Sequence, residues 1–146
     1  MLRTLAIRNF ILVEQLEIDL GAGFTVLTGE TGAGKSIFVD ALGLVLGGRG
    51  DAAVVRAGAE RAEISAAFDL GRQRDIHAWL RANDLASDDP ELLLRRVIDA
   101  QGRSRAYING ALATAGALKD LSSRLIELHG QHEHHTLLDQ IGRAHV

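Results

Sequence analysis

One stretch of the chain constrains its fold more than any other, and it reads Gly29-Glu30-Thr31-Gly32-Ala33-Gly34-Lys35-Ser36. It matches the phosphate-binding loop pattern G-x-x-x-x-G-K-[ST] at every fixed position. Glycines let the backbone curl until successive N–H groups face one point, and a helix that starts there directs the positive end of its dipole at that point. The stretch therefore predicts a site for nucleotide phosphates. Its expected binding residues are Gly29, Glu30, Thr31, Gly32, Ala33, Gly34, Lys35 and Ser36.

The residues on both sides of this loop have the pattern that the motif needs. Residues 24–28 are short, β-branched and apolar, which is typical of a strand buried in a parallel sheet. Residues 37–46 are apolar on nearly all sides, which predicts a buried helix that ends at Gly47-Gly48. Strand, glycine loop and helix thus follow one another in the required order, and the expected fold class is α/β.

Lys35 stands out because lysine is rare in this chain. The 16 basic residues include only two lysines, Lys35 and Lys119, and all the others are arginines. A lysine in the loop indicates a need for a compact ammonium on a slim stem. We expect Lys35 to act in catalysis by reaching the β- and γ-phosphates of ATP, and the hydroxyl of Ser36 to bind the Mg²⁺ that bridges them.

Composition narrows the class of protein. The 146 residues are one domain's worth of sequence, and 47% apolar with 24% charged residues is typical of a soluble globular protein. The chain has no cysteine, which excludes disulfides and cysteine metal sites, and no apolar run of the roughly 20 residues that a membrane span needs. A net charge of −3 argues against a strongly basic surface for nucleic acid. The composition is compatible with a cytoplasmic protein, and any contact with DNA must be local or lie elsewhere.

Hydrophobic periodicity predicts the remaining elements. Two strands are expected before the loop. After it, a strand, a helix, a hairpin, a tight turn, a second helix and a last strand are expected in that order. The ranges are strands 2–10 and 13–20, strand 60–70, helix 72–83, a hairpin of 92–98 with 104–108, a tight turn at Asn109-Gly110, helix 114–123 and strand 125–128.

A few side chains outside the loop invite a functional interpretation. Arg49 follows the central helix, so it is either a solvated arginine or a contact to nucleotide or DNA. Asp69 ends a weak apolar run and is not the expected Mg²⁺ ligand, and Trp79 fits packing better than base stacking. The arginines of the second hairpin predict a solvated surface or a surface for DNA or a partner. They are Arg95, Arg96, Arg103 and Arg105.

The stretch His129-Gly130-Gln131-His132-Glu133-His134-His135 is the second unusual one. Four histidines and a glutamate suggest a metal site. Their spacing, however, matches neither His-x-x-x-His on one helix face nor a known zinc pattern. The preferred interpretation is a loop at a strand end, in which one polar group reaches the Mg²⁺ of the nucleotide or the attacking water.

Three motifs together resemble a known family. Residues 5–10, the loop at 29–37 and the histidine-rich stretch at 129–134 are similar in order and spacing to the RecN family of bacterial DNA repair proteins, relatives of the SMC and ABC-type ATPases. The resemblance covers about residues 1–139. It implies that Gln131 is a catalytic glutamine that contacts Mg²⁺ and water. It also places Arg49 where related proteins carry an arginine linked to DNA-stimulated activity.

The resemblance implies partners as well as residues. It predicts ATP and Mg²⁺ as cofactors, a homodimer whose two heads close on ATP, DNA double-strand ends as the target, a recombinase as a partner, and a location at the nucleoid. Hydrolysis in such a protein serves DNA double-strand break repair and recombination.

The family's head also needs a signature helix, an Asp-Glu pair after an apolar strand and a switch histidine, none of which is found in this sequence. We therefore expect residues 1–140 to be the N-terminal half of an ATPase head, inactive alone, with a mixed sheet and antiparallel strands. Residues 141–146 do not resemble the family, and one reading frame of a common sequencing adaptor encodes the same hexapeptide, which suggests an assembly artefact. Two alternatives remain open: a stand-alone phosphate-loop kinase, and a non-catalytic module for dimerisation or DNA tethering.

Overall fold

The computed structural model describes residues 1–20 and 32–128, with side chains from residue 36 to residue 126 in the second range. This part of the chain forms a six-stranded sheet with the strand order β2-β1-β3-β4-β5-β6, and every neighbouring pair is antiparallel. The strands are β1 (Leu2–Phe10), β2 (Val13–Asp19), β3 (Arg61–Asp69), β4 (Glu91–Asp99), β5 (Ser104–Ile108) and β6 (Ala111–Ala113).

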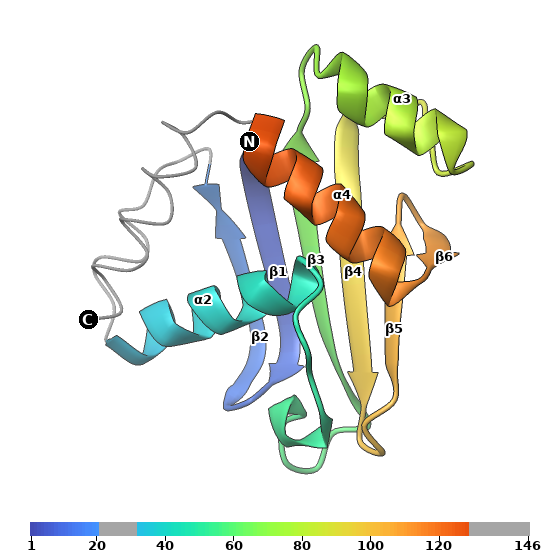
Figure 1. The fold of residues 1–146 in the computed structure, drawn as a ribbon. Helices are drawn as coiled ribbons and strands as arrows, with labels where there is room; N and C mark the ends of the chain where they lie inside the picture. The colour runs from blue at the N-terminus through green and yellow to red at the C-terminus, as the bar shows by residue number, and fades with distance from the viewer. Residues whose placement is uncertain (21–31, 129–146) are drawn as a thin grey trace.

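The helices lie on one side of this sheet. They are α2 (Gly32–Val45), α3 (Arg74–Ala82) and α4 (Ala115–Leu128), and a short 3₁₀ turn, η2, spans Ala52–Val54. Figure 1 shows α2 and α4 across the same face of the sheet, with α3 at one end of β3 and β4. The described strands and helices confirm the predicted α/β fold with antiparallel strands. No helix among the described residues is long and apolar enough to span a bilayer.

Alternation along the strands explains why one face is covered. Leu92, Leu94 and Ile98 of β4 are buried toward the helices, whereas Leu93 and Arg95 between them are exposed. The core side chains of the other elements follow the same rule. They include Leu5, Ile7, Ile18, Ile64, Phe68 and Ile108 from the sheet, and Phe38, Ala41, Val45, Leu118, Leu121 and Leu125 from the helices.

The predicted hairpins are present. The pair β1–β2 turns at residues 11–12, and β4–β5 turns over residues 100–103. Asn109 and Gly110 join β5 to β6 with φ angles of 51° and 83°, as a tight hairpin turn with two left-handed residues requires. The Asn109 side chain also accepts a hydrogen bond from the amide of Leu93 at 3.0 Å, which fixes the turn against β4.

The central helix begins earlier than the apolar pattern indicates, at Gly32 and not at residue 37. Its end agrees with the prediction. Gly47 has a φ of 108°, its amide donates to the carbonyl of Leu44, and the amide of Gly48 donates to the carbonyl of Gly43. These two bonds are the Schellman arrangement that ends helices at glycine.

The prediction of a strand at residues 125–128 is wrong, because α4 continues to Leu128. Leu118, Leu121 and Leu125 are spaced by three and four residues, and all three are buried on one side of the helix. Ile126 is 39% exposed, so the short apolar run at the end of α4 does not have two buried faces. Helical spacing over a longer window outweighs the local apolar run.

The prediction that Arg96 belongs to a solvated arginine surface is also wrong. Its exposed fraction is only 6%, because β4 directs it under the C-terminal end of α2. Nη1 donates to the carbonyl oxygens of Leu44 and Gly48, both at 2.7 Å, and Nε donates to Oγ of Ser104 at 2.8 Å. Burial lowers the pKa of Arg96, but a guanidinium stays charged at neutral pH.

These contacts explain why a charge is tolerated there. The carbonyl oxygens at the end of a helix carry partial negative charge and have no partner within the helix. Arg96 supplies donors to one of them, at Leu44, and to the carbonyl of Gly48 just after the helix, and so joins α2, β4 and β5 at one point. No carboxylate is bonded to Arg96 among the described residues, so the end of the helix itself stabilises the cation.

We predict that Arg96→Met lowers the free energy of unfolding by about 3 kcal/mol, because it removes the donors that Arg96 directs at the carbonyl oxygens of Leu44 and Gly48 and at Oγ of Ser104. The neighbouring change Arg95→Met is the matched control, since Arg95 is exposed and its ion pair with Glu63 contributes about 1 kcal/mol or less. Urea unfolding of both variants measures the difference. Equal losses of stability in the two variants would contradict this role for Arg96.

Candidate nucleotide-binding site

The structure places part of the phosphate loop at the start of α2. The backbone of Gly32, Ala33, Gly34 and Lys35 forms the beginning of the helix, and Ser36 follows directly. Gly29, Glu30, Thr31, the strand expected at 24–28 and the catalytic candidate Gln131 lie outside the described residues, as do the side chains of Gly32 to Lys35. The motif and the start of a helix thus coincide, as phosphate binding requires.

The N-terminal end of α2 has the electrostatics of an anion site. The first four backbone N–H groups of a helix have no partner within it, and the helix dipole adds positive potential there. No acidic residue occupies the first turn of α2, so no carboxylate of that turn competes with a phosphate for these N–H donors. A helix of 14 residues is long enough for its dipole to be fully developed at this end.

The rest of α2 is held firmly on the sheet. Phe38, Ala41 and Val45 are at most 1% exposed and lie in the main core cluster. Gly50, just after the helix, lies so close to the core that a Cβ there would stand 2.4 Å from Cδ1 of Ile98 and 2.7 Å from Cδ2 of Leu44. With Arg96 bonded to its last carbonyl groups, α2 is fixed at one end and along one side.

The donor set of the motif fits ATP with Mg²⁺. A serine hydroxyl and a glutamine amide oxygen are hard oxygen ligands, which Mg²⁺ prefers, and backbone N–H groups at a helix start suit phosphate oxygens. Within residues 1–20 and 32–128, no group of three or more His, Asp or Glu side chains could hold a metal ion. The histidine-rich stretch at 129–135 lies outside these ranges; α4, and not the expected strand, precedes it.

The other candidates from the sequence have structural positions of their own. Asp69 ends β3, where it accepts a hydrogen bond from the amide of Gly71 at 3.0 Å and pairs with Arg3 at 3.5 Å. Trp79 packs against the core and donates from Nε1 to Asp120 at 2.9 Å, which joins α3 to α4. Arg49 is exposed. None of these three side chains shows a link to the phosphate loop among the contacts of the described residues.

The turn between β4 and β5 depends on a residue that sequence patterns did not single out, Asp99. Its Oδ1 accepts from the amides of Gln101 at 2.9 Å and Arg103 at 3.0 Å, and its Oδ2 pairs with Nε of Arg103 at 2.8 Å. Burial raises the pKa of Asp99, but these backbone and side-chain bonds outweigh it and leave the pKa below its ordinary value. The role of Asp99 could have been predicted from one signal: an aspartate stands four residues before an arginine, and the turn between them contains a glycine.

We predict that the turn at residues 100–103 loosens as the pH falls. The folded-state pKa of Asp99 is lowered, so its contribution is present above the unfolded pKa of about 3.9 and is lost as the pH falls through the folded pKa. Measured against the intrinsic exchange rate at each pH, the protection of the amides of Gln101 and Arg103 from hydrogen exchange should fall below about pH 4 in the native protein. In Asp99→Asn, exchange at these amides should be faster at neutral pH and lack this pH dependence, and an unchanged profile would refute the role.

With the geometry established, comparison with known proteins shows the family. The model of the AAA domain matches residues 4–109. The DNA repair protein RecN of Xylella fastidiosa strain Temecula1 is 51% identical over 140 residues, which cover 96% of this chain and 25% of that protein. The RecN protein of Bacillus subtilis strain 168 is 38% identical over 139 residues, covering 95% of this chain and 24% of the relative.

Solved structures agree on the fold. A structure from work on ATP-driven dimerization and DNA-stimulated activation of SMC ATPases is 25% identical, with a TM-score of 0.65, and the match covers 84% of this chain and 77% of that one. The SMC head domain from Thermotoga maritima, at 17% identity and a TM-score of 0.54, covers 82% of this chain and 41% of its own. The chain spans about a quarter of the length of the curated relatives it matches. The chain therefore belongs to the AAA-domain family, and over nearly all of its length it is similar to RecN DNA repair proteins.

Proposed function

We propose that this chain supplies the ATP-binding half of a head ATPase that acts in the repair of DNA double-strand breaks and in recombination. The observation that carries the proposal is the coincidence of the motif at residues 29–36 with the start of α2. The helix is fixed to the sheet by its apolar side and by Arg96. The family of DNA repair ATPases to which the chain belongs supports the same reading.

Each residue of the motif has a distinct task. The backbone N–H groups of residues 29–34 bind and orient the phosphate chain. Lys35 places a positive charge where negative charge gathers on the transferred phosphoryl group, and Ser36 contributes an oxygen ligand. Gln131 orients the attacking water and completes the ligand set. Bound Mg²⁺-ATP supplies the bond to be cleaved and a metal charge that neutralises its oxygens.

The site is one half of a catalytic centre. We propose that the rest of the head and a second head provide the remaining groups, so that the homodimer closes over ATP and reopens after hydrolysis. Neighbouring structures are named for ATP-driven dimerization of SMC ATPases and for ATP-bound RecF in a recombination pathway, which supports an analogous cycle here. We place the protein in the cytoplasm, at the nucleoid, with DNA double-strand ends and a recombinase as partners.

The first test concerns Lys35. Lys35→Ala should weaken Mg²⁺-ATP binding by about 100-fold, because a charge-assisted bond to phosphate is lost. Lys119→Ala is the matched control, since Lys119 is the other lysine of the chain and lies exposed on α4. Isothermal titration of both variants in the full-length protein measures the difference. Unchanged affinity in Lys35→Ala would sink the assignment.

The second test concerns Gln131. Gln131→Ala should slow hydrolysis by about 100-fold and change ATP affinity much less, because the glutamine acts on the attacking water more than on the bound phosphates. Single-turnover hydrolysis and nucleotide titration of the full-length protein separate the two effects. A variant that loses affinity and turnover in equal measure would instead assign Gln131 to nucleotide binding alone.

A further inference from the structure

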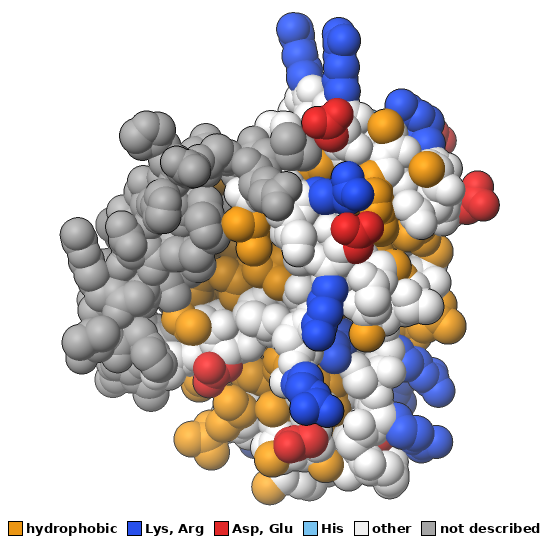
Figure 2. Space-filling model, viewed as in Figure 1, with side chains coloured by type: hydrophobic (Ala, Val, Ile, Leu, Met, Phe, Trp, Pro, Cys, Tyr) orange, Lys and Arg blue, Asp and Glu red, His pale blue; other side chains and the backbone are white. Residues whose placement is uncertain are grey.

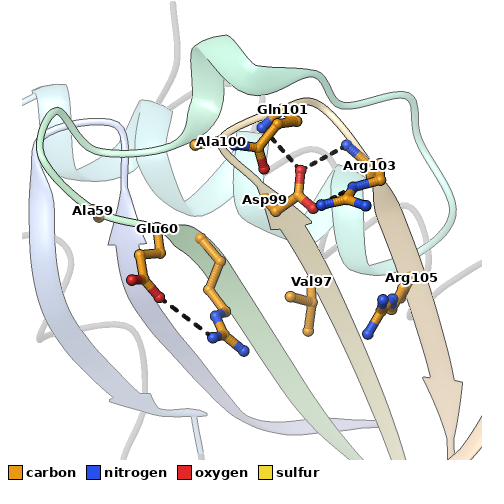
Figure 3. Close-up of a pocket in the computed structure, with 9 residues that line it drawn as sticks. Ala59, Glu60, Val97, Asp99, Ala100, Gln101, Arg103 and Arg105 are labelled. Carbon is orange, nitrogen blue, oxygen red and sulfur yellow. Dashed lines mark hydrogen bonds and ion pairs between the residues drawn. The ribbon is translucent and has the colours of Figure 1, made fainter.

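The uncovered face of the sheet carries a hollow that the ATP site does not use. It lies at the turn end of β3, β4 and β5, has a volume of about 470 Å³, and is drawn in Figure 3. The helices cover the opposite face, because Arg96 and Ile98 of β4 point toward α2 while Val97 and Asp99 point away. The lining residues are Ala59, Glu60, Arg61, Val97, Asp99, Ala100, Gln101, Arg103 and Arg105.

The floor and walls of this hollow have different chemistry. Val97 forms an apolar floor that is only 9% exposed, and its register neighbours on the flanking strands are Glu63 and Arg105. The walls are charged and open to water: the side chain of Arg61 is 58% exposed and that of Arg103 is 72% exposed. Small-molecule sites are enclosed and mainly apolar, so this open, charged hollow fits a large charged partner better.

The arginines are held in place with donors to spare. Arg103 pairs with Asp99 through Nε at 2.8 Å, and Arg61 pairs with Glu60 through one Nη at 3.6 Å (Figure 3). A guanidinium has five N–H donors, so one such contact leaves others available. Arg105 makes no ion pair with any of the described residues.

The surroundings extend the positive surface. Along the strand register, Arg8 lies opposite Glu63, Glu63 opposite Val97, and Val97 opposite Arg105. Arg95 pairs with Glu63 at 2.9 Å and covers the Tyr107 ring at 4.9 Å. The hollow and these neighbours thus bring together five arginines and three carboxylates, a net charge of +2 in a chain whose total is −3.

The net positive charge of this surface points to a polyanion. Figure 2 shows that the helix-bearing face also carries both Lys or Arg and Asp or Glu side chains. Arg61 and Arg105 stand on β3 and β5, two strand spacings apart and offset by two residues along the strands, so their backbones are about 12 Å apart. One nucleic-acid strand carries a phosphate about every 3.4 Å along its axis, so the two side chains can contact separate phosphates of one backbone.

The aromatic side chains on this surface indicate whether it suits single-stranded or double-stranded nucleic acid. Single-strand binders stack bases on exposed aromatic rings, but Tyr107, the aromatic ring that the described residues place on this surface, is already covered by Arg95. We propose that Arg61, Arg103 and Arg105 form a contact site for the phosphate backbone of double-stranded DNA. The site reads no sequence, because backbone contacts position a duplex without distinguishing its bases. This inference rests on the proposed function as a DNA repair ATPase.

The experiment compares two pairs of arginines in the full-length protein. Arg61→Gln with Arg105→Gln removes two charges from the hollow and keeps the Asp99–Arg103 turn intact. Arg72→Gln with Arg74→Gln is the control, because it removes the same charge from exposed positions at the start of α3. Fluorescence anisotropy with a labelled duplex measures affinity across a range of salt concentrations, and nucleotide titration measures ATP affinity in the same samples.

We expect the hollow variant to bind duplex DNA at least tenfold more weakly than the control. The slope of log affinity against log salt should fall by about 2, since each lost phosphate contact reduces it by about 0.9. ATP affinity should stay unchanged in both variants. An equal loss of DNA affinity in the two variants would overturn the site. So would displacement of the labelled duplex by an acidic peptide more readily than by unlabelled duplex DNA. If the unaltered protein bound DNA but not ATP, the proposed ATPase function would fail while this site stood.

Discussion

The contact on which the rest of the structure depends is that of Arg96 with the end of α2. Two carbonyl oxygens at and just after that helix end, those of Leu44 and Gly48, accept hydrogen bonds from a side chain of β4. Because the same side chain also bonds Ser104 of β5, the position of the central helix is set by two strands together. The helix that carries the last residues of the phosphate loop is therefore fixed to the sheet at its C-terminal end.

This arrangement relates the two surfaces of the molecule that we assign to ligands. Ser104, which accepts from Arg96, stands between Arg103 and Arg105 of the proposed DNA contact. A single buried guanidinium thus joins the helix of the nucleotide site to the strand that carries the DNA site. Figure 2 shows apolar side chains at the surface between α2 and α4.

Much of the fold could be predicted from the sequence, for identifiable reasons. Alternation in β1 to β5, the Asn109-Gly110 turn and the Gly47-Gly48 helix end are all local signals, and local signals survive folding. The strand prediction at residues 125–128 was wrong because four residues are too few to show a helical period. Leu125 belongs with Leu118 and Leu121 to the buried face of α4.

The roles of Arg96 and Asp99 could not be predicted in the same way. Arg95 and Arg96 are adjacent and chemically identical, and only their position in the β4 alternation sends one to solvent and the other beneath a helix that lies about 50 residues earlier in the chain. Such a partner is invisible to any pattern of nearby residues. For the nucleotide site, the motif predicted the start of α2, while the catalytic roles of Lys35 and Gln131 remain proposals drawn from chemistry and family.

A crystal structure of the full-length protein with Mg²⁺ and a non-hydrolysable ATP analogue tests the central claim most directly. We predict that the triphosphate lies at the N-terminal end of α2, with Nζ of Lys35 on its β- and γ-phosphate oxygens. Arg96 should still bond the carbonyl oxygens of Leu44 and Gly48. A triphosphate bound elsewhere, or an α2 detached from Arg96 while nucleotide is bound, would contradict the account.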